Sequence, residues 1–113
     1  MTIKEVAAMI QSIGVPFAYY QFPEGTEQAC PFICFYFDSS NDFLADNRNY
    51  QKIRPLSIEL YTDNKNFILE ETVEGVLTDN GFVYTREESY IDSEHMYLVV
   101  FETSVAITEE EGE

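Results

Sequence analysis

The stretch that decides the fold runs from Leu56 to Gly81 and reads LSIELYTDNKNFILEETVEGVLTDNG. Its first part alternates the apolar residues Leu56, Ile58 and Leu60 with polar ones. This period of two is typical of a strand with one buried face. The sequence therefore predicts a strand over residues 53–62.

The second part of this stretch predicts a helix over residues 64–79. Asp63 or Asn64 can accept hydrogen bonds from the first helical turn, and apolar residues then recur at helical spacing up to Leu77. Asn80-Gly81 supplies the left-handed residue that commonly ends a helix. Gly75 costs on the order of 1 kcal/mol relative to alanine inside a helix, so we expect another backbone to approach it closely.

The flanking segments predict the other elements of one domain. Thr2 and Glu5 form a capping box for a helix over residues 2–13, which Gly14 and Pro16 end. Further strands are expected at 17–22, 31–38, 82–86 and 96–107, with an acidic turn at 87–94. The apolar run 31–38 reads as a strand buried on much of both faces, the second face being covered by another subunit. Segment 38–52 is either a long hairpin tip or a short extra strand.

Together these elements predict an α+β fold in the order α-β-β-β-α-β-β. We expect one mixed, mostly antiparallel sheet with both helices packed on one face. The domain should span residues 1–108, and the acidic residues 109–113 should form a flexible tail.

The charge of the chain limits its partners. Twenty-one acidic residues stand against six basic ones, which gives a net charge of −15. Such a surface repels phosphate backbones, so we expect no direct, charge-driven binding to nucleic acid and none to anionic membranes. The N-terminus has no pattern of a secretory leader, and no apolar run is long enough to span a bilayer. We expect synthesis in the cytosol.

Residues that could carry chemistry do not form a complete site. Cys30, Cys34 and His95 are too few and too scattered for zinc, and on one strand the two cysteine Cα atoms would lie about 13 Å apart, beyond disulfide reach. The loop that starts at Asp38 lacks the glycine and the glutamate of a calcium hand, because Asn49 holds its twelfth position. We therefore expect a protein that is not an enzyme and has no metal or cofactor.

Acidic residues of the second helix and of the predicted turn are expected in solvent. Glu70, Glu71 and Glu74 read as the wet face of the helix. Arg86 is the only cation near the acidic turn in the sequence. The predicted acidic surface consists of Asp42, Asp46, Glu87, Glu88, Asp92 and Glu94.

Aromatic residues are more numerous than one small core can hide, with nine phenylalanines and eight tyrosines. Tyrosine suits partly buried protein interfaces, because its ring is apolar and its hydroxyl is polar. We predict an oligomer or partner interface that draws on Tyr19, Tyr20, Phe35, Phe37, Phe43, Tyr50, Tyr61, Tyr90 and Tyr97.

Five stretches in a fixed order resemble a known family. They are FAYY at 17–20, PFICFY at 31–36, FLADNRNY at 43–50, IELYTDNK at 58–65 and YIDSEHMY at 90–97. As an ordered set they resemble the small tail-completion proteins of long-tailed (siphovirus-type) bacteriophages and prophages, of the tail-terminator type. The similarity runs over nearly the whole chain, and none of its motifs is a catalytic signature.

The resemblance implies an α+β subunit that assembles into a ring, typically a hexamer, on the head-proximal end of a finished tail tube. Such a ring stops growth of the tube and offers a surface to the head-tail connector. It implies as partners further copies of the chain, the tail tube protein and the connector protein, with assembly in the host cytoplasm and a final place in the virion. An acidic bore would let DNA pass without adhering.

Two other functions remain open at this point. The chain could be another component of the phage neck, since heads and tails use several related small connector proteins. It could instead be an acidic DNA mimic that inhibits a DNA-binding protein, which requires carboxylates spaced like phosphates over one face.

Overall fold

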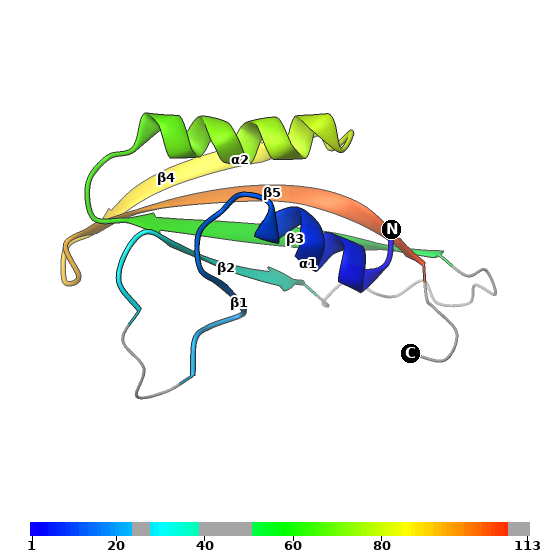
Figure 1. Ribbon diagram of the computed structural model, residues 1–113, viewed down its shortest axis with the longest axis horizontal. Helices are drawn as coiled ribbons and strands as arrows, with labels where there is room; N and C mark the ends of the chain where they lie inside the picture. The colour runs from blue at the N-terminus through cyan, green and yellow to red at the C-terminus, as the bar shows by residue number, and fades with distance from the viewer. Residues whose placement is uncertain (24–27, 39–50, 109–113) are drawn as a thin grey trace.

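The computed structural model describes residues 1–23, 28–38 and 51–108. Its five strands form one sheet in the order β1-β2-β3-β5-β4, in which β1 runs parallel to β2 and every other pair is antiparallel. The α+β fold and the order α-β-β-β-α-β-β are thereby confirmed (Figure 1). The elements are α1 (Ile3–Gln11), β1 (Phe17–Tyr19), β2 (Phe32–Phe37), β3 (Gln51–Thr62), α2 (Phe67–Asp79), β4 (Thr85–Ile91) and β5 (Met96–Thr108).

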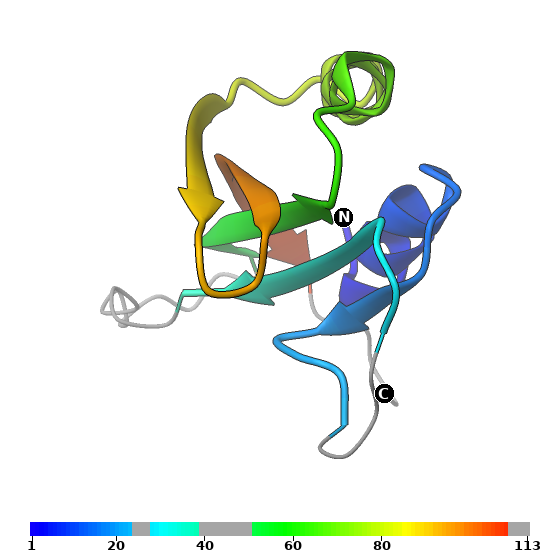
Figure 2. The same cartoon turned by 90° about the vertical axis from the view of Figure 1, so that its left-hand side faces the viewer.

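One face of the sheet carries the core. Leu56, Ile58 and Leu60 of β3 are at most 1% exposed, as their alternation predicts, and full burial of such a side chain contributes about 1.5–3 kcal/mol. Both helices cover this face of the curved sheet and leave the other face open (Figure 2). The helices contribute Val6, Met9, Ile10, Val73 and Leu77 to the core.

The first helix begins as its sequence predicts. Glu5 N–H donates to the Thr2 hydroxyl at 3.1 Å, and Thr2 N–H donates to the Glu5 carboxylate at 2.9 Å, which completes the capping box. Gly14 follows the last turn with φ +96°, a conformation that a side chain would strain.

The second helix begins later than predicted. Asn66 caps α2, since its side-chain oxygen accepts the Leu69 N–H at 3.0 Å, so the prediction of Asp63 or Asn64 is wrong. Gly81, at φ +85°, ends the helix as expected. The expected close approach to Gly75 is also wrong, because a Cβ placed there would meet nothing within 4 Å.

The two outer strands differ from the sequence expectation. β1 is shorter than predicted and ends at Tyr19. β4 extends to Ile91, through most of the predicted acidic turn, because an edge strand paired on one side only can carry charged residues along its length. The turn that remains holds His95, at φ 54°, with its N–H donating to the Asp92 carbonyl.

The apolar strand β2 is buried in its centre within this one chain. Ile33 and Phe35 face the helices, and Cys34, which faces the other way, is 5% exposed. Cys30 precedes a cis peptide bond to Pro31 and lies outside the strand. The expected covering of the second face by another subunit stays a prediction.

The hairpin or extra strand expected within 38–52 falls mainly on residues 39–50, which lie outside the described residues. The expected tail at 109–113 and the loop 24–27 lie outside them as well.

Candidate interaction surfaces

The two faces of the sheet differ in charge. Alternation along β3, β4 and β5 places Glu59, Glu87 and Glu102 on the helix-free face, whereas Arg54 and Arg86 point to the helix side. Among the described strand residues, the helix-free face carries no lysine or arginine. This face therefore offers carboxylates and half-buried apolar side chains, and no described strand places a lysine or arginine beside them.

Aromatic rings gather on the helix-free face near β2. Phe32 stacks on Tyr61 with ring centroids 4.8 Å apart, and Phe22 meets Phe32 edge-on at 5.5 Å. Tyr20 lies edge-on against Tyr36 at 5.6 Å. Such pairs contribute about 0.5–1.5 kcal/mol beyond their buried area, which holds the rings in a fixed arrangement.

The predicted interface aromatics do not form one patch. Tyr19 and Tyr20 are exposed at the β1 edge of the sheet, and Tyr90 is exposed at the opposite edge on β4. Three others are half-buried: Phe37, Tyr61 and Tyr97.

One of the predicted interface residues is wrong. Phe35 is 5% exposed because it fills the core between β2 and the helices. Phe43 and Tyr50 lie outside the described residues.

The predicted acidic surface is divided as well. Glu87 lies on the helix-free face, Glu88 lies on the helix side, and Asp92 and Glu94 occupy the turn between β4 and β5. Arg86 is not the only cation near Glu88, since Lys65 Nζ lies 2.9 Å from its carboxylate. The two remaining predicted acids, Asp42 and Asp46, lie outside the described residues.

A cluster of ion pairs on the helix side overturns the prediction of a fully wet helix face. Glu70 of α2 is only 2% exposed. Its carboxylate accepts hydrogen bonds from Lys65 Nζ at 2.6 Å and from Arg86 Nη2 at 2.9 Å. Arg86 Nη1 also donates to Glu74 at 2.9 Å, and Lys65 lies over the ring of Phe67, 5.0 Å from its centroid.

The cluster keeps its members charged. Burial raises the pKa of Glu70, but the hydrogen bonds and charges of Lys65 and Arg86 outweigh it, so the net pKa lies below the usual value. Burial lowers the pKa of Lys65, while Glu70 and Glu88 raise it more, and the hydrogen bonds to Glu70 and Glu74 raise that of Arg86. The cluster ties α2 to β4 and to the corner after β3. It therefore has a structural role.

The residues that could bind metals stay apart in the described part of the chain. No group of three or more histidine, cysteine, aspartate or glutamate side chains there could hold a metal ion. Both cysteines are free thiols, and burial together with the charge of Glu59 raises the pKa of Cys34. A thiol in this state is a weak nucleophile.

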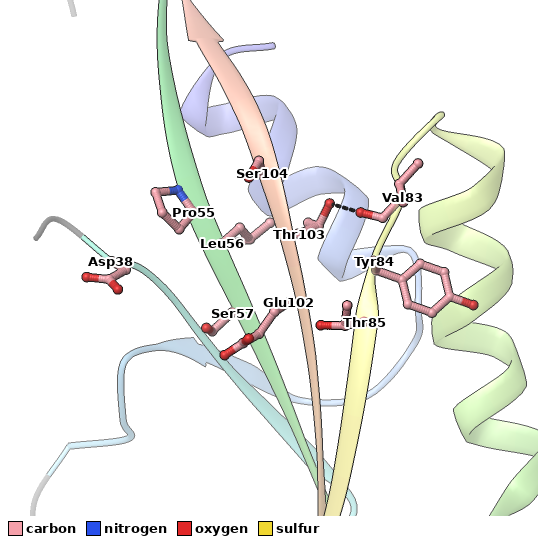
Figure 3. Close-up of a pocket in the computed structure, with 10 residues that line it drawn as sticks. All are labelled: Asp38, Pro55, Leu56, Ser57, Val83, Tyr84, Thr85, Glu102, Thr103 and Ser104. Carbon is pink, nitrogen blue, oxygen red and sulfur yellow. Dashed lines mark hydrogen bonds between the residues drawn. The ribbon is translucent and has the colours of Figure 1, made fainter. Parts of the chain in front are cut away.

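A groove with polar side chains on its floor opens on the helix-free face, beside the start of β4. It has a volume of about 360 Å³. Its floor holds three residues that are neighbours in register on adjacent strands, namely Ser57 of β3, Glu102 of β5 and Thr85 of β4 (Figure 3). Asp38 lies at the rim on the far side of the groove from Thr85 (Figure 3). Tyr84, also at this end, points away toward α2 (Figure 3). Sequence patterns did not single out this groove, because its members come from four separate segments.

Comparison of the sequence with known protein families and with curated proteins gives no match. The structure is similar to a chain in a solved structure described as "Virion of native gene transfer agent (GTA) particle". The TM-score is 0.53 at 14% sequence identity, and the match covers 92% of this chain and 88% of that chain. At this identity the likeness shows a shared fold over nearly the whole length of both chains.

In the described part of the chain, neither helix has the length and hydropathy needed to cross a membrane.

Proposed function

We propose that this protein is a structural subunit of a phage-type virion, and more narrowly a tail-completion subunit of the tail-terminator type. In this role its copies form a ring, typically a hexamer, on the head-proximal end of the tail tube, stop growth of the tube and present a surface to the head-tail connector. The supporting observation is the fold shared over 92% of this chain with a chain of a virion particle. The ordered motifs of the sequence support the narrower role.

The placement of exposed tyrosines supports a ring. A closed ring needs head-to-tail contacts, in which two different sides of each subunit meet. Tyr19 and Tyr20 are 54% and 62% exposed at the β1 edge, and Tyr90 is 46% exposed at the β4 edge. These two edges are therefore the sides that we expect to face neighbouring copies.

The charge supports passage of DNA through the ring. Lys65 and Arg86 are engaged in ion pairs with glutamates, so two of the six basic residues neutralise internal partners. A ring of subunits with a net charge of −15 each would repel the phosphate backbone of DNA in its bore. The role is structural rather than enzymatic, and assembly takes place in the host cytoplasm before the ring enters the virion.

The acidic DNA mimic receives less support. A mimic displays carboxylates at phosphate-like spacing, but Glu70, Glu74 and Glu88 are bound to Lys65 and Arg86. Three carboxylates of the helix side are thus engaged within the chain.

The decisive experiment deletes the gene from the phage or prophage that encodes this chain and examines the induced lysate by electron microscopy. A terminator is expected to give tails that exceed the normal length and carry no heads, and the chain supplied from a plasmid should restore normal particles. Tails of normal length without heads would assign the protein to another part of the neck. Intact virions would refute a role in tail completion.

A further inference from the structure

The groove on the helix-free face contains a mostly buried serine whose hydroxyl has no hydrogen-bond partner among the described residues. Ser57 is 6% exposed, and its hydroxyl makes no hydrogen bond with any residue in the described part of the chain. No buried side-chain oxygen or nitrogen among the described residues is both sealed from solvent and unbonded, so the Ser57 hydroxyl reaches solvent through the groove. A hydroxyl held in this way is available to a ligand.

The neighbours of Ser57 define the chemistry of that ligand. Glu102 lies directly opposite Ser57 on β5, and Thr85 lies opposite Glu102 on β4, so a hydroxyl stands on each side of one carboxylate (Figure 3). Glu102 is exposed and forms no ion pair with a described residue. No lysine or arginine is among the described residues that line the groove. The arrangement suits a cationic group that donates several hydrogen bonds.

Two features favour a guanidinium over a metal ion. The described residues contain no group of three metal ligands, and divalent cations such as calcium require several oxygen donors of that kind. A guanidinium has five N–H donors in a plane, which matches a carboxylate flanked by hydroxyls, and it stacks on aromatic rings. Tyr36, the register neighbour of Ser57 on β2, carries such a ring on the same face of the sheet, although it is not among the residues that line the groove.

We propose that this groove binds an arginine side chain presented by a basic segment of a partner protein. Glu102 pairs with the guanidinium, and the hydroxyls of Ser57 and Thr85 accept its remaining N–H groups. The net charge of −15 attracts the basic segment toward the molecule, and the groove fixes the position of one arginine. The inference stands whether or not the protein completes a tail.

The test is an NMR titration of the full-length, isotope-labelled protein with the peptide acetyl-Gly-Arg-Gly-amide. The expected result is saturable shifts at the backbone amides of Ser57, Thr85 and Glu102. The same peptide with citrulline in place of arginine keeps the shape and removes the charge, so it should give no saturable shift. Equal binding of the citrulline peptide, or shifts spread evenly over all acidic residues, would overturn the proposal.

Two matched variants locate the binding within the helix-free face. Glu102→Gln should lower the affinity for the arginine peptide by about fivefold or more, because it removes the negative charge inside the groove. Glu87→Gln removes the same charge from the same face outside the groove and should change the affinity by less than about twofold. An equal loss of affinity in both variants would mean that the peptide is attracted to the negative charge of the whole surface, and would refute the groove as a site. Calcium that binds these residues in preference to the arginine peptide would refute it as well.

Discussion

At the residue scale, Glu70 departs furthest from what its surroundings in the sequence indicate. A glutamate inside an amphipathic helix is normally solvated, yet this one is 2% exposed and receives hydrogen bonds from Lys65 and Arg86. A carboxylate at this depth is tolerated because both of its oxygens are paired with cations. The pairing makes Glu70 sensitive to substitution.

Glu70→Ala should lower the free energy of unfolding by about 1.5–3 kcal/mol, because it removes the buried carboxylate that Lys65 and Arg86 share. Both cations keep a more exposed partner, since Lys65 still pairs with Glu88 and Arg86 with Glu74. Glu71→Ala removes the same group from the exposed neighbouring position and should change stability by less than about 0.5 kcal/mol. Urea unfolding followed by circular dichroism measures both. Equal effects of the two substitutions would mean that the cluster contributes nothing specific.

The same carboxylate gives stability a dependence on pH. The pKa of Glu70 lies below its unfolded value of about 4.3, so its contribution is complete above that value and disappears as the pH falls through the folded pKa. The difference in unfolding free energy between the wild type and Glu70→Gln should therefore be largest at about pH 7 and shrink toward about pH 3. Urea unfolding of both proteins at several pH values checks this. A difference that stays constant down to about pH 3 would contradict the ion pairing of Glu70.

The partners of Glu70 explain why the sequence did not predict its burial. Lys65 is five residues away in the chain and Arg86 is sixteen, and only the pairing of β4 with β5 brings Arg86 under α2. Periodicity correctly placed Val73 and Leu77 in the core, since burial of apolar residues depends on local pattern. Pairing across elements depends on register. That information is not contained in a short window of sequence.

At the element scale, one glycine inside α2 and one just after it have opposite requirements. Gly75 lies inside the helix, and a Cβ there would meet nothing within 4 Å, whereas Gly81 follows the helix at φ +85°. Gly75→Ala should raise the free energy of unfolding by about 0.5–1 kcal/mol, since alanine restricts the unfolded chain and favours the helix. Gly81→Ala should lower it by about 1 kcal/mol or more, because the left-handed conformation strains a side chain. Urea unfolding of the pair measures both signs, and destabilisation by Gly75→Ala would indicate a neighbour that the structure does not place there.

Element type was easier to predict than element boundaries. The strand alternation and the capping box of α1 depend on residues a few positions apart, and both were confirmed. β4 was predicted too early because TREESYI is rich in charge, which is unusual for a strand except at the edge of a sheet. The groove was not predicted at all. The residues of its floor are far apart in the chain and are brought together only by the register of three antiparallel strands, which no sequence motif encodes.

At the scale of the whole molecule, the fold combines an apolar core with a surface of one dominant sign. Its charge of −15 opposes contact between copies, because like charges repel until salt screens them. The exposed tyrosines at two opposite edges favour the same contact through apolar burial. Assembly of the isolated protein should therefore depend on ionic strength. Added salt should favour assembly, because it screens the charge repulsion and leaves the apolar burial of the tyrosines in place.

We expect the purified protein to be mainly monomeric at about 0.05 M salt and to form rings at about 0.5 M, where the Debye length is only a few ångströms. Light scattering coupled to size exclusion measures this shift. Tyr20→Asn removes the most exposed of the edge tyrosine side chains. Asparagine tolerates the left-handed conformation at this position (φ 71°), so the variant should fold normally and assemble less. Ile68→Gln replaces an apolar side chain that is 77% exposed on α2 rather than at either sheet edge, and it should leave assembly unchanged. Rings that dissociate when salt is added would instead mean that ion pairs between copies hold them together, and the tyrosine edges would then not be the contact.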